Sequence, residues 1–187
     1  MSYKKSIERY INSLIAVLQS LDRTQIDRFI KALKEIRSAG KNIFIFGNGG
    51  SGSTASHVTG DFNKGCSYNK QKRFKVTCLN DNNATLLAYA NDVSYEDVFF
   101  EQLKNFMEPG DLVIAISGSG NSKNIIKAID YANENGALTI GLTGFDGGRL
   151  KEISQIVLHA NINDMQKAED IHLILNHIAM QILGRER

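Results

Sequence analysis

The chain has 187 residues, a formal net charge of +2, and 42% hydrophobic against 22% charged residues. These are the values of an ordinary globular protein, and they exclude a disordered or collagen-like chain. Lysine and arginine are scattered rather than gathered in one block, so the charge predicts neither a nucleic acid nor a membrane surface as a partner. The length predicts one domain over residues 1–187.

Two features bear on the cellular compartment. Cys66 and Cys78 lack the CxxC spacing of a zinc knot, which predicts two reduced thiols in a reducing compartment. The apolar N-terminal stretch is interrupted by Glu8, Arg9 and Asn12, so it reads as an amphipathic helix rather than a signal peptide. No window reaches the roughly 18 apolar residues of a membrane span. We therefore expect a cytoplasmic protein.

Helices and strands are predicted to alternate along the chain. Apolar residues at helical spacing predict one helix over 4–21 and a second from Asp22 or Thr24 to Gly40. This helical pair, within residues 1–38, is expected to pack on the domain or on a partner subunit. Short apolar runs then predict strands over 42–47, 73–79, 112–117, 137–143 and 156–160, and the segments between and after them predict helices over 51–63, 82–106 (one or two), 121–135 and 166–184. Such alternation is typical of an α/β fold with a parallel sheet.

Two strands are each followed by a turn rich in glycine and serine. GNGGSGS (47–53) follows the first strand, and SGSGNS (117–122) follows the third. Ligands of open parallel sheets bind beyond the carboxyl ends of the strands. The free N–H groups of a helix start favour an anion there, and serine hydroxyls add neutral donors. The two turns therefore predict a phosphate site, with Lys123 as an available cation.

The first turn also matches the GxGxxG pattern of dinucleotide-binding folds. That fold needs an acidic residue about 20 positions later, at the end of the second strand. Position 72 is a lysine, and Asp81 comes too late. A nucleotide cofactor would also leave the second turn unexplained, so it is disfavoured.

The histidines and carboxylates offer a candidate metal site. His57 and Asp61 are four residues apart, which suits either a metal pair or a plain hydrogen bond. On the last helix, Glu169 and His177 lie about 80° apart and about 12 Å along the axis, so one straight helix cannot bring both to one ion. Either one of them reaches a site in a neighbouring subunit, or only one is a ligand, or the helix is bent.

Other polar residues have simpler interpretations. His159 and His172 are expected to be structural, packed or hydrogen-bonded inside the fold. Asn91 and Asp92 follow an apolar run and indicate either a capped turn or a pair that holds substrate hydroxyls.

Five motifs together resemble a known family. They are GNGGS (47–51) with His57, AxANDxxYED (88–97), ISGSGNS (116–122), LTGFDGG (142–148) and EDIHxxxxH (169–177). They are similar to those of the sugar isomerase (SIS) domain and, within it, of the phosphoheptose isomerases, which act on sedoheptulose 7-phosphate. The resemblance runs from about residue 4 to 184. It implies a flavodoxin-like three-layer α/β/α sandwich with a five-stranded parallel sheet and two N-terminal helices, assembled as a homotetramer with active sites between subunits.

The resemblance also implies roles for particular residues. Ser117, Gly118, Ser119 and Ser122 would hold the phosphate, and Asn48, Gly49, Gly50 and Ser51 would line the sugar, whose hydroxyls Asn91 and Asp92 would contact. His57, Asp61, Glu169 and His177 would bind Zn²⁺. Asp61, Glu169 and His177 would also be catalytic, and Glu169 would touch the substrate.

Two positions depart from the family pattern. Asp61 stands where the family has a longer glutamate, and Glu169 stands where it has glutamine. Both replacements keep an oxygen ligand, so a divalent ion still fits. A base displaced by about 1 Å can nevertheless cost roughly 10²-fold in rate. These departures imply a different substrate position, a specialised subgroup, or isomerase activity that is reduced or absent.

The implied reaction is an aldose–ketose isomerisation, in which a proton moves between C1 and C2 of a sugar phosphate through an enediol. It needs a base, a group that stabilises the developing oxyanion and an anchor for the sugar. Two alternatives remain open at this point. One is a non-catalytic module that senses a phosphosugar or binds a protein, and the other is an isomerase of a different sugar phosphate.

Overall fold

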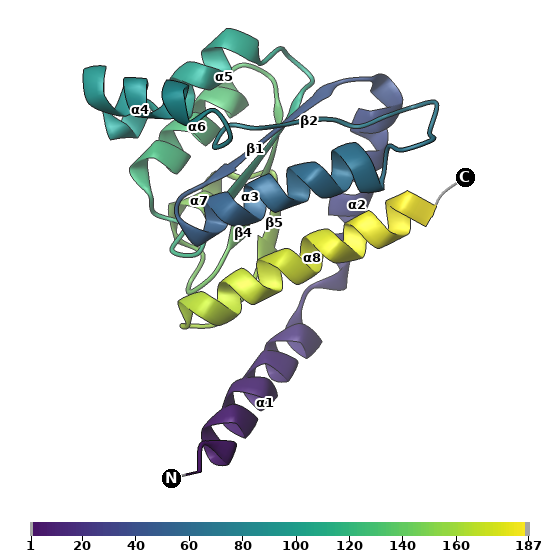
Figure 1. The fold of residues 1–187 in the computed structure, drawn as a ribbon, viewed down its shortest axis with the longest axis vertical. Helices are drawn as coiled ribbons and strands as arrows, with labels where there is room; N and C mark the ends of the chain where they lie inside the picture. Colours follow the sequence, from purple (N-terminus) through teal and green to yellow (C-terminus); the bar gives the residue numbers. More distant parts are fainter. Residues whose placement is uncertain (1, 186–187) are drawn as a thin grey trace.

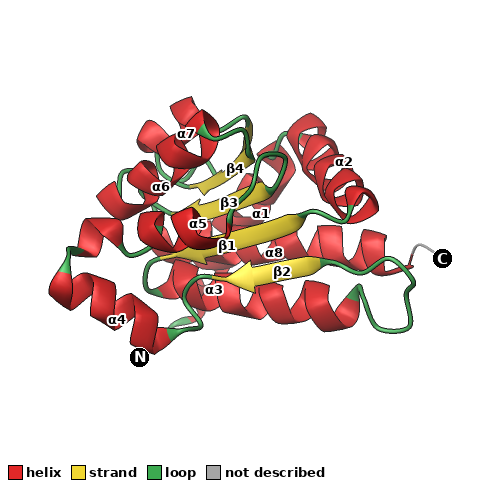
Figure 2. Cartoon of the chain, turned by 90° about the horizontal axis from the view of Figure 1, so that it is seen from above, coloured by secondary structure: helices red, strands yellow, loops and turns green. Residues whose placement is uncertain are grey.

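A computed structural model describes residues 2–185 of the chain. Its sheet has five parallel strands in the order β2-β1-β3-β4-β5, as Figures 1 and 2 show. The strands are β1 (Asn42–Gly47), β2 (Lys75–Cys78), β3 (Leu112–Ser117), β4 (Leu138–Thr143) and β5 (Ile156–His159). This is the flavodoxin-like order, whose switch point lies between β1 and β3. The predicted α/β class is therefore confirmed.

Helices cover both faces of this sheet. The α-helices of the described residues are α1 (Lys4–Ser20), α2 (Arg23–Ala39), α3 (Gly50–Gly60), α4 (Asn83–Asp92), α5 (Phe100–Phe106), α6 (Lys123–Glu134), α7 (Gly148–Ile153) and α8 (Met165–Arg185). One apolar core joins α2, α3 and α8 to one face of the sheet, and a second joins α5, α6 and α7 to the other. The central strand β3 is buried along its whole length, as a strand covered on both faces should be.

The predicted ends of a helix agree with the structure where capping residues mark them. The Asp22 side chain accepts hydrogen bonds from two backbone N–H groups at the start of α2, and Gly40 ends that helix with a left-handed φ of 67°. These are the capping devices that the sequence predicts. Strand β2 is shorter than the predicted 73–79.

Three segments differ from the predicted elements. The helix predicted over 51–63 ends at Gly60 and continues as a π-helical turn, Asp61–Gly65. The segment 82–106 divides into α4, a 3-10 turn called η2 (Tyr95–Asp97) and α5. Helix α7 is absent from the sequence prediction, because its six residues are too few for a periodic pattern.

The two N-terminal helices behave differently. Helix α2 buries Phe29 and Leu33 completely, whereas α1 buries only Val17. Helix α1 projects from the body of the domain (Figure 1). It is held to α8 by the Tyr10 hydroxyl, which donates a 2.5 Å hydrogen bond to the Asp170 carboxylate, and this bond is the main reason that the pKa of Tyr10 rises to about 12.

Two further predictions concern the cysteines and the absence of a membrane span. Both cysteines are free and buried, and burial raises the pKa of Cys66 to about 11 and that of Cys78 to about 12. No helix within residues 2–185 has both the length and the hydropathy needed to cross a bilayer.

Candidate functional site

A cavity of about 270 Å³ lies where the two glycine–serine turns meet. Because β1 and β3 are parallel neighbours, their carboxyl ends and the turns that follow lie side by side at one edge of the sheet. The cavity is lined by Asn48, Gly49, Gly50, Ser51, Ile116, Ser117, Gly118, Ser119, Ser122, Met165 and Glu169. Nine of these eleven residues are ones that the sequence singles out as substrate-binding. The structure thus brings two turns, 70 residues apart in sequence, into one site.

The second turn is open to an anion. It leads into α6, and Ser122 precedes that helix without making a side-chain cap. Its hydroxyl therefore remains available to a ligand, beside the Ser119 hydroxyl and the backbone of Gly118 at the cavity wall. The start of a helix attracts negative charge because its first N–H groups have no partner within the helix.

The first turn already faces a negative charge. A methyl group added at Gly50 would lie only 2.5 Å from Oε1 of Glu169, so that carboxylate rests against the first residue of α3. Like charges repel, so a phosphate would be unfavourable at this turn. The structure therefore distinguishes the two turns, and it favours a phosphate at the second turn and a neutral part of a ligand at the first.

Three residues that the sequence predicts to contact the substrate do not line the cavity. Asn91 and Asp92 are exposed at the end of α4 and are hydrogen-bonded to each other, with 2.7 Å between Asn91 Nδ2 and Asp92 Oδ1. Lys123, the expected cation, forms a 2.9 Å ion pair with Glu96. Any contact of these side chains with a ligand stays a prediction.

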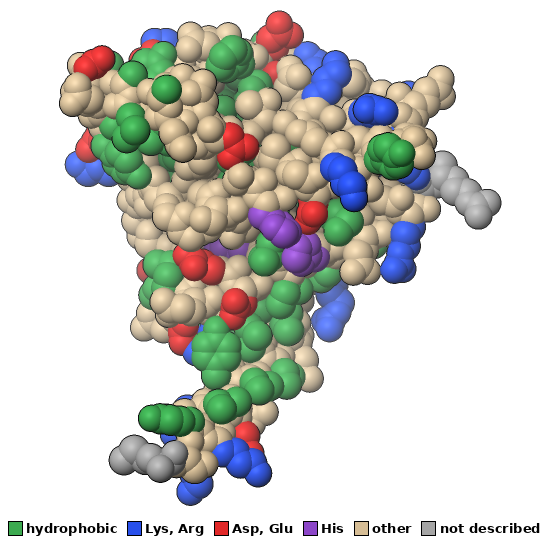
Figure 3. All heavy atoms as spheres, in the orientation of Figure 1, with side chains coloured by type: hydrophobic (Ala, Val, Ile, Leu, Met, Phe, Trp, Pro, Cys, Tyr) green, Lys and Arg blue, Asp and Glu red, His purple; other side chains and the backbone are tan. Residues whose placement is uncertain are grey.

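A second cluster lies farther along α3 and α8. His57 on α3, Asp61 in the π-helical turn and His177 on α8 bring three donor atoms within 4.8 Å of one another. The two Nε2 atoms are 3.1 Å apart, and Asp61 Oδ2 lies 3.3 Å from His57 Nε2 and 3.5 Å from His177 Nε2. Figure 3 shows histidine side chains at the surface of this face with an acidic group beside them.

These distances fit a divalent cation. Four ligand atoms around a tetrahedral zinc ion at about 2.0–2.1 Å lie about 3.3 Å from one another, which matches the three separations. Asp61 Oδ2 is also buried without a hydrogen-bond partner, and a buried carboxylate oxygen is costly unless something neutralises it. Two imidazoles and one carboxylate form a common zinc-binding set.

Glu169 does not belong to this cluster in a single chain. It lies two turns earlier on α8, at the cavity, as the helical spacing of Glu169 and His177 requires. Its role as a metal ligand stays a prediction. Three residues therefore follow one another along α8. Met165 lies against Gly118, Glu169 lies against Gly50, and His177 belongs to the cluster.

The remaining histidines lie inside the fold. The ring of His159 contacts the Thr143 hydroxyl at 3.0 Å, and burial lowers its pKa. His172 is fully buried, and neither of its ring nitrogens has a hydrogen-bond partner of good geometry. Desolvation lowers the pKa of His172 from the ordinary 6.5 to about 4, and the nearby Thr143 backbone offsets this effect only in part. Both histidines take the structural role that their sequence context predicts.

His172 should make the fold sensitive to acid. Between pH 6.5 and 4 the unfolded chain binds a proton on this ring that the folded chain does not, so stability falls as the pH falls. A shift of this size corresponds to about 3 kcal/mol. Urea unfolding of a His172→Leu variant should therefore show a weaker loss of stability between pH 7.5 and 4.5 than the wild type. If stability fell equally with pH in the two proteins, His172 would not be the source of the acid sensitivity.

Sequence reasoning missed some residues that shape the site. Asn80 closes the end of the first turn, because its amide accepts from Gly47 N at 3.2 Å and donates to Gly47 O at 2.8 Å. Asn124 is buried beneath the cavity and bonds to Asn48. Asn124 lies just after the recognised ISGSGNS motif, and Asn80 follows the second strand, but single asparagines give no pattern of their own.

Comparisons with known proteins agree with this geometry. The SIS domain family matches residues 8–144 of the chain. A phosphoheptose isomerase of Crocosphaera subtropica is 39% identical over 139 residues, covering 74% of this chain and 70% of that protein. One of Aliarcobacter butzleri is 34% identical over 161 residues, covering 86% and 85%. The solved structure of a phosphoheptose isomerase from Francisella tularensis superposes with a TM-score of 0.90 at 24% identity, covering 100% of both chains.

Proposed function

This chain belongs to the SIS domain family, and on that basis we propose that it is an aldose–ketose isomerase that converts sedoheptulose 7-phosphate to a heptose 7-phosphate. The observation that carries the proposal is the shared cavity of the two turns, with an open anion site at one wall and the Glu169 carboxylate at the other. Relatives named phosphoheptose isomerase match most of the chain at 30% identity or more, which supports the same substrate.

The phosphate group would bind at the second turn. Ser117, Ser119 and Ser122 line this part of the cavity, and Ser122 directly precedes the start of α6. Neutral donors suffice for a dianion here, because the helix start supplies partial positive charge. With one end held in this way, the sugar carbons extend along α3 and α8.

The proton transfer needs a base that reaches C1 and C2. Glu169 is a carboxylate that lines the cavity, and this supports its role as the base that would take the proton from one carbon and return it to the other. Asp61 and His177 lie farther along the same pair of helices and form the second candidate acid–base set. Asn48, Gly49 and Gly50 line the part of the cavity that would hold the sugar.

The residues of the cluster fit a zinc site. His57, Asp61 and His177 would hold the ion, and zinc bound there would polarise the carbonyl and the neighbouring hydroxyl of the sugar. The carboxylate of Glu169 would be the further ligand, supplied by a neighbouring chain, because one straight helix cannot bring Glu169 and His177 to the same ion.

A homotetramer is part of the same proposal. Helix α1 leaves Ile7, Ile11 and Ile15 between 45% and 56% exposed. These residues recur at every fourth position and form one apolar stripe, seen in Figure 3 along the projecting helix. A stripe of this kind on a helix that buries little of itself supports association with the same helix of other copies.

The direct test is turnover. Purified protein with zinc should convert sedoheptulose 7-phosphate to an aldose phosphate. Chromatography of the sugar phosphates would measure this conversion. A Ser119→Ala variant should raise KM about 5- to 10-fold, because one donor to the phosphate is removed. Ser38→Ala, on the exposed end of α2, should leave KM unchanged. Absence of turnover with wild-type protein, together with binding of the sugar phosphate, would favour the sensing module instead.

A further inference from the structure

We propose that Asn124 and Tyr95 are positioning residues that lock the Asn48 carboxamide, so that it presents an N–H group rather than its oxygen to the cavity. The inference rests on the proposed function, because it concerns how the sugar phosphate is read by the first turn. Neither residue lines the cavity itself. Both act through Asn48, which does.

The Asn48 carboxamide is held from two sides. Its Oδ1 accepts a 2.9 Å hydrogen bond from the Tyr95 hydroxyl and another of 2.9 Å from Asn124 Nδ2, while its own Nδ2 donates to Asn124 Oδ1 at 3.0 Å. The two asparagines therefore form a reciprocal amide pair. Asn124 is 2% exposed, so its side of the pair is shielded from water.

A backbone group fixes which way the pair points. The oxygen and nitrogen of an asparagine side chain can exchange places by a flip, and only their partners decide the orientation. Asn124 Oδ1 also accepts from the backbone N–H of Ile125 at 3.0 Å. The Ile125 N–H, which also donates to the Ser122 carbonyl at 3.0 Å, can only donate, so this contact favours the Asn124 oxygen there and the Asn124 nitrogen toward Asn48 Oδ1. The orientation of Asn48 follows.

The hydrogen bonds leave Asn48 with one unused group. A carboxamide oxygen accepts two hydrogen bonds, and its nitrogen donates two. Tyr95 and Asn124 use both acceptor positions of Asn48, and Asn124 uses one of its two N–H groups. The remaining N–H is what Asn48 offers a ligand. The first turn therefore recognises an oxygen that accepts a hydrogen bond, such as a sugar carbonyl or hydroxyl.

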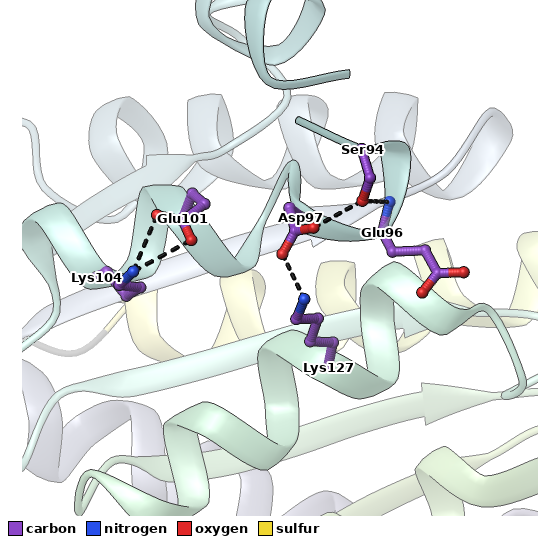
Figure 4. Close-up of polar contacts among 6 residues, drawn as sticks. All are labelled: Ser94, Glu96, Asp97, Glu101, Lys104 and Lys127. Atoms are coloured by element: carbon purple, nitrogen blue, oxygen red, sulfur yellow. Dashed lines mark hydrogen bonds and ion pairs between the residues drawn. The ribbon is translucent and has the colours of Figure 1, made fainter. Parts of the chain in front are cut away.

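Tyr95 is kept in place by the elements around it. It belongs to η2, and η2 is fastened to α6 by an ion pair of 2.5 Å between Asp97 and Lys127. Ser94 donates to Asp97 at 2.6 Å and accepts from the Glu96 N–H, as Figure 4 shows. The Lys127 contact and then the Ser94 contact lower the pKa of Asp97. Because α6 also carries Asn124, both positioning residues are held by the same helix.

The test compares two tyrosines. Tyr95→Phe removes only the hydroxyl, and the residue is 55% exposed, so the fold does not depend on it. We expect KM for sedoheptulose 7-phosphate to rise about 3- to 10-fold with kcat changed less than 2-fold, because ground state and transition state lose the same contact. Tyr89→Phe is the matched control, since its hydroxyl bonds to Asn105 instead, and both constants should stay at the wild-type values.

A second readout does not depend on turnover. The side-chain amide signals of Asn48 and Asn124 in a ¹⁵N NMR spectrum, assigned by their loss in Asn48→Ala and Asn124→Ala, should shift in Tyr95→Phe and stay unchanged in Tyr89→Phe. Unchanged amide signals in Tyr95→Phe would overturn the inference, as would an unchanged KM in an active enzyme. If the wild type shows no turnover, the proposed function fails, and the amide signals alone decide the positioning role.

Discussion

An Asp61→Ala variant is expected to lose bound zinc and about 10²- to 10⁴-fold of its isomerase activity. The Asp61 Oδ2 atom is the one anionic donor among the three groups that meet on α3 and α8, at 3.3 and 3.5 Å from the two imidazole nitrogens. Two neutral imidazoles alone bind a divalent ion much more weakly, and a lost acid–base group costs a rate factor of this size. Metal content by mass spectrometry after dialysis and kcat/KM are the two measurements.

The matched control is Asp27→Ala, which removes an exposed carboxylate on α2. It should retain zinc and full activity. The metal-free Asp61→Ala protein should also be at least as stable to urea as the metal-free wild type, because Asp61 Oδ2 is buried without a hydrogen-bond partner. Stability retained together with zinc lost would identify a functional role, and full zinc retention by the variant would exclude Asp61 as a ligand.

A Gly120→Ala variant is expected to lose about 2–5 kcal/mol of folding free energy and to bind the sugar phosphate more weakly, because the second glycine–serine turn is displaced. Gly120 has a φ of 65°, and a Cβ there would lie 1.9 Å from the carbonyl oxygen of Gly147. The left-handed conformation costs alanine roughly 1–2 kcal/mol. Overpacking against a neighbouring backbone adds about 1–3 kcal/mol, and relief requires the second turn to move away from α7.

Gly40→Ala separates these two contributions. Gly40 has nearly the same φ, 67°, and nothing lies within 4 Å of a Cβ added there. Its variant should therefore lose only the conformational part and keep its activity. Urea unfolding of the two variants measures the difference between their losses of stability. KM for the sugar phosphate shows whether the second turn still binds its ligand. Equal losses of stability in both variants would show that the close approach to Gly147 does not matter.

The fold could be predicted from sequence because its strands are short, continuous and apolar. A run such as LVIAIS (112–117) is typical of a strand buried on both faces, and the structure has β3 at those residues. Such patterns are local, and so are the caps at Asp22 and Gly40. Helix α7 and the π-helical turn were not predicted because they have only six and five residues, too few for a periodic signal.

The candidate site could be predicted in part for a topological reason. Once the strands are parallel, turns that follow them must meet at one edge, so Ser51 and Ser119 were expected to share a cavity, as they do. The orientation of single side chains could not be predicted in this way. The amide pair of Asn48 and Asn124 depends on a contact across 76 residues of sequence. Nothing in the sequence around either asparagine indicates which residue it pairs with.

The hydrogen bond between Tyr10 and Asp170 has a consequence for substitutions on α1. It attaches the projecting helix α1 to the residue next to Glu169 in the chain. A substitution on α1 that removes this hydrogen bond would therefore release the Asp170 carboxylate, one residue away from the cavity-lining Glu169.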